Sequence, residues 1–407
     1  MKKKLLTAFA VGLFLLNTAG CGKKAEPETV QISVWSAEAQ LPQVQAALEE
    51  FAKLHEGEVI LEYTVSAEGE DTCKETILSN PEGAADIFAF ADDQMDALYN
   101  AGCLLEISED ADAVLESVGG AESGAAAAAM REGKLYAYPM SAGNGYFLYY
   151  NKEYFGEDDL GELDWILAVA GANGKYFTMD FGSGWYIYSF FKGAGLEVTA
   201  DADGTHNLCN WNATDTKYTG RDVAEAMLKI AGHPGFVSLG DDGFTQGVKD
   251  GSVIAGVNGA WNAQTVEEAW GENYGAVKLP TYTLNGDQVQ MCSFMGYKLI
   301  GVSAYTKYPE WSMKIAEYLS GEEQQLKRFE TIGDCPANLN AATASEVQAA
   351  PAIAAITEQS RYGYRQNVAD PFWEASKIFG ITISAGNPSE EDLQTLLDET
   401  VEAITGE

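Results

Sequence analysis

Histidine, cysteine and basic residues are scarce in this sequence, and each shortage excludes a class of function. The 407 residues include 3 histidines and 6 cysteines. None of them forms a Cys-x-x-Cys pair or another cluster with metal-ligand spacing, so we expect no metal and no cofactor. Against 61 acidic residues stand 25 lysines and arginines, which gives a formal net charge of -36. Because so acidic a chain repels phosphate backbones, we expect no nucleic-acid partner.

Apolar runs long enough to span a bilayer are also missing from the sequence. The run from Leu5 to Leu16 is too short for that, and it follows the basic residues Lys2–Lys4. This order is typical of a secretory signal. The segment LNTAGC that ends at Cys21 resembles a bacterial lipobox, which implies cleavage before Cys21 and diacylation of its thiol. The alternative is an ordinary signal peptide with a coincidental cysteine. We predict a signal peptide over 1–20 and a lipid-anchored tether over 21–29, on the outer face of the cell membrane in a Gram-positive type of envelope.

Signatures of catalysis are absent as well. The segment FGSGW at 181–185 is not a G-x-S-x-G nucleophile elbow, and AGANGKY at 170–176 lacks the spacing of a phosphate-binding loop. The 61 acidic residues always offer pairs that could hydrolyse a glycoside, but nothing singles one pair out. We therefore predict no catalytic residues and no enzyme activity, and we keep a secreted glycosidase as an alternative.

What the sequence does contain is an alternation of strand and helix patterns. Residues 31–36 alternate as a strand does, 41–57 carry apolar residues at helical spacing, and 58–65 and 85–91 are again strands. This order predicts a parallel sheet with helices on both faces. Two further helices are expected, one in the alanine-rich segment 121–130 and one at the C-terminus, opened by a capping box from Ser389 to Asp392.

Aromatic residues make up 11% of the chain, with 20 tyrosines, 17 phenylalanines and 8 tryptophans. Flat rings of this kind bury the apolar face of a ligand. The surplus therefore points to a site where a ligand stacks on aromatic side chains.

Four segments of the sequence carry a recognisable pattern together. In chain order they are REGKLYAYPMSAGNGYFLYYNKEYF (131–155), FTQGVKDGSVIAGVNGAW (244–261), YGAVKLP (274–280) and GYKLIGVSAYTKYPEWSMKIAEYLSGEEQQLKRF (296–329). Taken in this order, they resemble the bacterial extracellular solute-binding proteins of carbohydrate ABC transporters, the maltose-binding type. They resemble that family's crossing segment, its strand and Gly-x-Trp turn, a short strand, and its return strand with two helices.

The resemblance implies an α/β fold of two lobes, the type II periplasmic-binding-protein fold. Each lobe has a central, mostly parallel sheet flanked by helices and is discontinuous in sequence, and the ligand lies in the cleft between the lobes. We expect lobe one from 30–142 and 295–338, and lobe two from 143–294 and 339–407. The lobes are expected to close on the ligand by hinge bending.

The resemblance also implies the ligand-binding residues, position by position. After the third strand, Phe90 replaces a stacking Trp, Asp93 matches a hydroxyl-binding Asp, and Gln94 replaces an Arg. The family's Asp-Lys pair falls near Ala39 and Gln40, with Glu38 as the acid expected to substitute in part. The remaining expected positions are Asn144 for a pocket Glu, and the aromatic residues Trp185, Tyr186, Trp261 and Trp373.

The aromatic positions are kept while the charged contacts to the sugar are changed. Aromatic rings bury the C–H face of a sugar, and Asp, Asn, Gln and Glu side chains bind its hydroxyl rim. Together with the lipobox, the resemblance therefore implies a monomeric lipoprotein that captures an oligosaccharide, with the maltodextrin type favoured, and delivers it to the membrane permease subunits of an ABC importer. The alternatives are another solute for the same fold, such as a polyamine suited to an acidic cleft, and the glycosidase named above.

Overall fold

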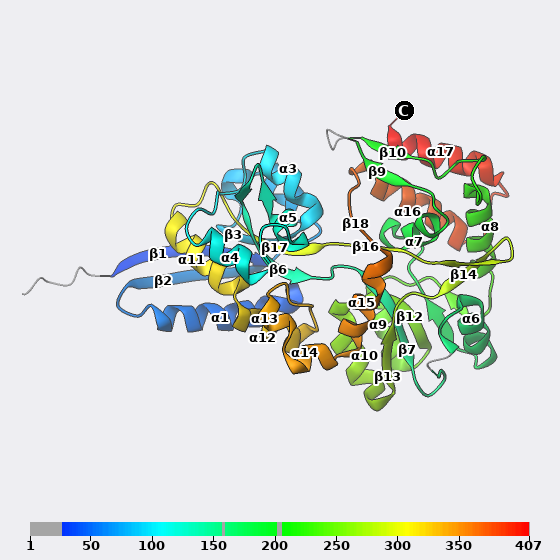
Figure 1. Ribbon diagram of the computed structural model, residues 1–407, viewed down its shortest axis with the longest axis horizontal. Helices are drawn as coiled ribbons and strands as arrows, with labels where there is room; N and C mark the ends of the chain where they lie inside the picture. The colour runs from blue at the N-terminus through cyan, green and yellow to red at the C-terminus, as the bar shows by residue number, and fades with distance from the viewer. Residues whose placement is uncertain (1–26, 157–158, 202–205, 407) are drawn as a thin grey trace, which may run out of the picture.

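The computed structural model describes residues 27–156, 159–201 and 206–406. The predicted signal peptide and the lipidation site Cys21 lie outside these residues. Within the described ranges, no helix is both long and apolar enough to cross a membrane. Figure 1 shows two bodies side by side, joined by segments of chain that run between them.

The first body, lobe one, is built on a five-stranded sheet in the order β2-β1-β3-β17-β6. Strand β1 pairs in parallel with β2 and β3, whereas β17 is antiparallel to both β3 and β6. One strand therefore runs against the other four. The strands are β1 (Glu28–Ser36), β2 (Val59–Ala67), β3 (Ile87–Ala91), β6 (Ala137–Ala142) and β17 (Tyr297–Val302).

The second body, lobe two, repeats this arrangement with the order β11-β8-β12-β7-β13. Strands β11, β8 and β12 are parallel, and β7 is antiparallel to both β12 and β13. Again one strand opposes four, so the predicted α/β fold with a mostly parallel sheet in each lobe is confirmed. The strands are β7 (Tyr146–Asn151), β8 (Tyr176–Thr178), β11 (Phe236–Val237), β12 (Val253–Gly259) and β13 (Tyr274–Val277).

Helices cover both faces of the second sheet, as β7 shows. All six of its residues are buried. Tyr146, Leu148 and Tyr150 belong to one apolar cluster, and Phe147 and Tyr149 belong to another on the opposite face, as the twofold period of a strand requires. A strand with two buried faces has no polar side, which is why β3 and β7 are almost continuously apolar in sequence.

Three segments of chain join the lobes. The first runs from β6 to β7 through Gly143–Gly145, and the second runs from β16 (Ser293–Met295) through Gly296 into β17. For the third, the predicted boundary between the lobes falls between residues 338 and 339. The segment Cys335–Asn338 lies on lobe one, because Ala142 N donates to Cys335 O and Gln325 Oε1 accepts from Ala337 N and Asn338 N. Helix α13 (Leu339–Ala342) also packs on α12 (Glu322–Ile332). The lobe boundaries stay a prediction, and these contacts favour a crossing after Ala342.

The remaining elements surround the two sheets (Figure 1). Around lobe one they are α1 (Leu41–Leu54), α2 (Cys73–Ser79), α3 (Met95–Asn100), α4 (Ala111–Ser117), α5 (Gly124–Ala129), β4 (Met130–Arg131), β5 (Lys134–Leu135) and α11 (Pro309–Ser320). Around lobe two and the third crossing they are α6 (Leu163–Ala172), α7 (Gly184–Gly193), β9 (Val198–Ala200), β10 (Asn207–Cys209), α8 (Gly220–Ala231), α9 (Asp241–Asp250), α10 (Ala263–Trp270), β14 (Thr281–Leu284), β15 (Asp287–Gln290), α14 (Ser345–Ala349), α15 (Pro351–Gln359), β18 (Gly363–Arg365), α16 (Pro371–Ser384) and α17 (Leu393–Thr405).

Most of the local predictions hold, with one correction at a helix start. The strands and helices predicted over 31–91 are present, and the alanine-rich segment forms α5 with Ser123 as its N-cap. The capping box predicted to begin at Ser389 is wrong. Asp392 caps α17 instead, because its side chain accepts hydrogen bonds from Gln394 N and Thr395 N.

Candidate functional site

Several strands of both sheets end at the boundary between the lobes. In lobe one, Asp92 and Asp93 follow β3 directly in a short 3₁₀ helix, and Gln40 lies at the end of another that follows β1. In lobe two, Trp261 follows β12. Ligands of α/β sheets bind outside the carboxyl ends of the strands, so this interlobe boundary is the candidate site.

Asp92 is a buried carboxylate at this boundary. Its Oδ1 accepts a hydrogen bond of 2.9 Å from the backbone N of Tyr297. A Cβ at Gly296 would stand 2.3 Å from the same oxygen, so this close approach requires glycine. The other oxygen, Oδ2, lies 3.8 Å from Nε of Arg365 in β18. Burial raises the pKa of Asp92 to about 6, against the lowering effect of the Tyr297 hydrogen bond.

Asp93, the predicted hydroxyl-binding acid, lies beside it. Its Oδ1 is buried and has no hydrogen-bond partner among the described residues. Burial, and then the neighbouring Asp92 carboxylate, raise the pKa of Asp93 to about 7. A carboxyl group that titrates there can accept or donate a hydrogen bond, and a sugar hydroxyl can meet it in either role.

Two glutamines predicted to bind ligand are already occupied by contacts within lobe one. Gln94 donates to the carbonyl oxygens of Glu70 and Asp71 at 2.8 and 2.7 Å, and it accepts from Lys74 N at 2.9 Å. It thus holds the loop before α2. Gln40 is likewise buried, and its Nε2 donates to Glu70 at 2.8 Å. Both amides serve the structure of lobe one, so we leave them out of the proposed ligand contacts.

Gln40 belongs to a buried charge network on lobe one, made of Gln40, Glu70, Lys298, Arg328 and Asp334. Arg328 hydrogen-bonds both Gln40 and Asp334. The Nζ of Lys298 lies 3.5 Å from Glu70 and 3.6 Å from Asp334. Burial lowers the pKa of Lys298, but Asp334 and Glu70 outweigh burial and the net shift is upward. Two cations and two anions balance, as buried charges must.

Three other predicted positions differ in their access to the boundary. Phe90 is fully buried in the core of lobe one, 5.9 Å from Phe88 between ring centroids, and it has no exposed face for stacking. Glu38 is exposed. Asn144 is half-buried in the first crossing, where its backbone N donates to Gly296 O at 3.0 Å. Of these three, Asn144 lies in a crossing segment and, like Asp92, close to Gly296. Phe90 is left out of the proposed site.

On lobe two the aromatic residues form a wall. Trp185 stacks on Phe294 with ring centroids 5.4 Å apart, and its buried Nε1 has no hydrogen-bond partner among the described residues. Trp373 lies 6.3 Å from the same Phe294 ring. Tyr186 is nearly buried and packs 5.0 Å from Tyr146. The structure therefore gathers Trp185 and Trp373 around Phe294, with both tryptophans partly accessible.

Trp261 stands apart from that wall and is firmly held. Its Nε1 donates to Asp241 Oδ2 at 3.1 Å. Asp241 opens α9 and also accepts from the amides of Asn258 and Asn262, at 2.9 and 3.2 Å. A Cβ at Gly259 would come within 2.0 Å of the indole, so the ring lies directly against the glycine. Trp261 is half-buried and is thus fixed while part of its surface remains accessible.

Contacts across the boundary tie the two lobes together. Lys74 in α2 pairs with Asp370 at the start of α16, at 2.5 Å. Nζ of Lys298 lies 5.7 Å from the ring centroid of Trp261. The candidate site is therefore bounded by carboxylates and a lysine from lobe one and by indole rings from lobe two.

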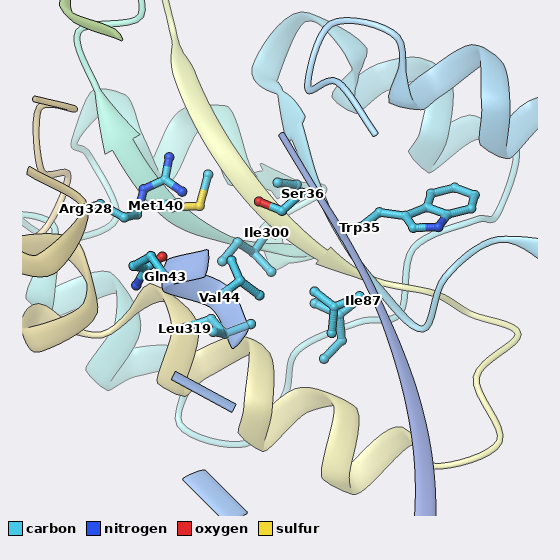
Figure 2. Close-up of a pocket in the computed structure, with 11 residues that line it drawn as sticks. Trp35, Ser36, Gln43, Val44, Ile87, Met140, Ile300, Leu319 and Arg328 are labelled. Atoms are coloured by element: carbon cyan, nitrogen blue, oxygen red, sulfur yellow. The ribbon is translucent and has the colours of Figure 1, made fainter. Parts of the chain in front are cut away.

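Two hollows in the structure do not belong to this boundary site. A cavity of about 20 Å³ inside lobe one is lined by apolar side chains with Ser36, Gln43 and Arg328 (Figure 2). It has room for a water molecule but not for a sugar ring. A groove of about 330 Å³ lies between α10, α12 and α14. Its lining includes none of the residues predicted to bind ligand.

Sequence reasoning missed several residues at the boundary. Asp92 is adjacent to the predicted Asp93, and a second acid after a buried strand was a usable signal. Asp241, Lys298 and Arg365 come from distant segments, and no local pattern marks them. Among the described residues, no group of three or more His, Cys, Asp and Glu side chains could hold a metal ion.

Comparison with known proteins shows which family and which relatives the chain resembles. The family described as bacterial extracellular solute-binding protein matches residues 46–355. A galactooligosaccharide-binding protein of Bacillus subtilis (strain 168) is 25% identical over 100% of this chain and 98% of its own length. A maltooligosaccharide ABC transporter solute-binding lipoprotein of Streptococcus pneumoniae (strain ATCC BAA-334 / TIGR4) is 26% identical over 68% of each chain.

Solved structures agree on the fold. One determined with acarbose is 28% identical, with a TM-score of 0.81 over 93% of this chain and 99% of that one. The maltodextrin binding protein MalE1 from L. casei BL23 has a TM-score of 0.75 at 22% identity, over 93% of this chain and 99% of that one. The family match covers more than half of the sequence, and the chain belongs to the bacterial extracellular solute-binding proteins.

Proposed function

We propose that this chain captures an oligosaccharide between its lobes as the binding component of an ABC importer. The observations that carry this proposal are the partly accessible tryptophans of lobe two and the unpartnered oxygen of Asp93 on lobe one. Trp185, Trp261 and Trp373 offer ring surface for C–H faces. Asp93 has a buried oxygen with no hydrogen-bond partner among the described residues, which suits a sugar hydroxyl.

The identity of the sugar is a finer proposal. Relatives are named for galacto-oligosaccharides and for malto-oligosaccharides. We favour a maltodextrin-type ligand, because the sequence keeps the aromatic platforms of the maltose-binding type at Trp185, Trp261 and Trp373. The charged sugar contacts of the maltose-binding type are replaced, as at Gln40 and Gln94, so the glycosidic linkage is determined by the experiment that follows.

Titration calorimetry with maltotriose, maltotetraose, galacto-oligosaccharides and spermidine tests the proposal. Three stacked rings, net of the cost of ordering, support a roughly micromolar Kd for the right sugar. Binding of spermidine but of none of the sugars would replace the sugar by a cation. Release of shorter sugars on incubation would indicate a glycosidase instead. A wild-type protein that binds none of these ligands would overturn the proposal.

The same proposal places the protein on the outer face of the cell membrane as a monomer, anchored at Cys21 and delivering sugar to permease subunits. Two acyl chains give stable attachment where one does not. Cys21→Ser should therefore move the protein from the membrane fraction to the soluble fraction. If this variant stays with the membrane, the lipid anchor is wrong. Light scattering of the soluble form measures whether the chain is a monomer.

A further inference from the structure

The buried charge network of lobe one has one member that reaches the other lobe. Lys298 lies at the start of β17, next to the crossing at Gly296. Two carboxylates, Glu70 and Asp334, flank its Nζ, and the indole of Trp261 faces it at 5.7 Å. The side chain is 9% exposed. A nearly buried ammonium with its carboxylates on its own lobe thus meets an aromatic ring of the opposite lobe.

The two lobes are also closely packed at Gly333, near the contact between Lys298 and Trp261. Gly333, which ends α12 on lobe one, has a φ of 76°. A Cβ there would stand 2.9 Å from Cβ of Ala263 and 3.1 Å from the carbonyl oxygen of Ala260, both on lobe two. Backbone and side chains of the two lobes therefore meet where Lys298 meets Trp261. The cation–ring contact is part of a formed interface between the lobes.

Trp261 is also held within its own lobe. Asp241 accepts from its Nε1, and Gly259 lies against its ring carbons. These contacts fix the indole plane relative to lobe two. The contact with Lys298 then fixes it relative to lobe one, because a cation is attracted to the face of an indole.

We propose that Lys298 is a positioning residue of the sugar site: its ammonium binds the indole of Trp261 where the two lobes meet, with or without sugar, so that the contact between the lobes and sugar binding share one side chain. This inference rests on the proposed function in taking Trp261 as a sugar platform. Lys298 itself need not touch the sugar, since two carboxylates and the ring surround its ammonium.

Calorimetry with maltotetraose, or with whichever sugar the wild type binds, measures the effect. Lys298→Met should weaken sugar binding roughly three- to thirtyfold, the range expected for a cation–ring contact. Lys298→Arg keeps the charge and the contact and should restore affinity to within about threefold. The matched control is Lys314→Met. Lys314 lies 4.7 Å from the ring centroid of Trp311, but both residues are on α11, away from the boundary, and affinity should not change.

A double-mutant cycle separates positioning from simple damage. Trp261→Leu should weaken binding, and adding Lys298→Met should weaken it little further, because the lysine acts through the ring. If Lys298→Met does not fold, Lys298→Gln takes its place, since it keeps a donor for Glu70 and Asp334 without the charge. Wild-type affinity in the folded, uncharged variant, or losses that multiply in the double variant, would overturn the inference.

Tryptophan fluorescence measured without sugar tests the positioning role of Lys298 separately from the proposed function. The difference between wild-type and Trp261→Leu spectra isolates the emission of Trp261. The same difference taken in the Lys298→Met background should be shifted, and in the Lys298→Arg background it should be close to wild type. Should the wild type bind no sugar, the proposed function fails and this spectrum alone decides: an unshifted difference spectrum overturns the positioning role as well.

Discussion

The two sides of the interlobe boundary are built from different chemistry. Lobe one presents polar and charged groups, and most of them are already paired within that lobe, as Gln40 and Arg328 are. Lobe two presents the partly accessible rings of Trp185, Trp261 and Trp373. In the proposed site, lobe one therefore supplies a rigid polar edge, and lobe two supplies the apolar surface that a ligand buries.

Breaking the charge network should have the largest effect, and the effect should be on stability. Arg328→Met leaves Asp334 and Gln40 buried with fewer partners, which typically costs about 3–5 kcal/mol of unfolding free energy. Chemical denaturation followed by circular dichroism measures it. A loss below about 1 kcal/mol would show that lobe one does not depend on this network.

Truncating a ring on lobe two should lower sugar affinity much more than it lowers stability. Trp373→Ala removes apolar contact worth about 2–3 kcal/mol, or roughly 30- to 150-fold in sugar affinity. Stability should change less, because a half-buried side chain leaves no enclosed cavity. Trp165→Ala is the matched control, since Trp165 is an exposed indole on α6 of the same lobe. Equal affinity of the two variants would contradict the assigned role of Trp373.

The carboxylates of lobe one should make stability depend on pH. The pKa of Asp93 is raised to about 7 in the folded protein, well above its value in an unfolded chain. The folded state therefore binds more protons between about pH 4 and pH 7, and this contribution to stability is lost as pH rises through 7.

Asp93→Asn removes that titration. The melting temperature of the wild type should fall more between about pH 5 and pH 8 than that of the variant. Asp250→Asn serves as a control, because hydrogen bonds from Ser252 lower the pKa of Asp250 and it does not titrate in this range. Identical pH profiles for wild type and Asp93→Asn would show that Asp93 is not buried as described.

The smallest effect is expected at the rim. Lys74→Met removes the ion pair with Asp370, in which the lysine side chain is 13% exposed and the carboxylate 71% exposed. Because the carboxylate is solvated, the pair contributes up to about 1 kcal/mol and is screened by salt. Sugar affinity should drop by at most about fivefold at low ionic strength, and the difference should vanish in about 1 M salt. A salt-independent loss would mean that Lys74 touches the ligand.

The sequence predicted the elements of the fold well, because the patterns that define them are local. The helical spacing over 41–57 and the apolar run at 85–91 each reflect burial of nearby residues. The residues of the candidate site were harder to predict. Phe90 lies in a strand buried on both faces, where periodicity does not tell core from pocket. The hydrogen bonds of Gln94 go to a loop some twenty residues earlier in the chain, and no pattern around Gln94 reveals them.

The residues that join the lobes were not predictable in the same way. Lys298 and Trp261 reach each other because the start of β17 and the end of β12 lie at one boundary, which depends on how two whole sheets are placed. A family register assigns a residue to a position in the chain. It does not say which of its atoms are already paired.

The position of β17 between β3 and β6 constrains how the chain can fold. Strands β3 and β6 are complete by Ala142, yet neither can gain its inner hydrogen-bonded neighbour until Val302 is available. During synthesis, the inner edges of both strands would stay unpaired while about 160 further residues are added, and unpaired strand edges promote aggregation. Pairing over so long a separation also folds slowly. Lobe one, which is first in the sequence, therefore cannot be completed until most of lobe two, residues 146–277, has been made.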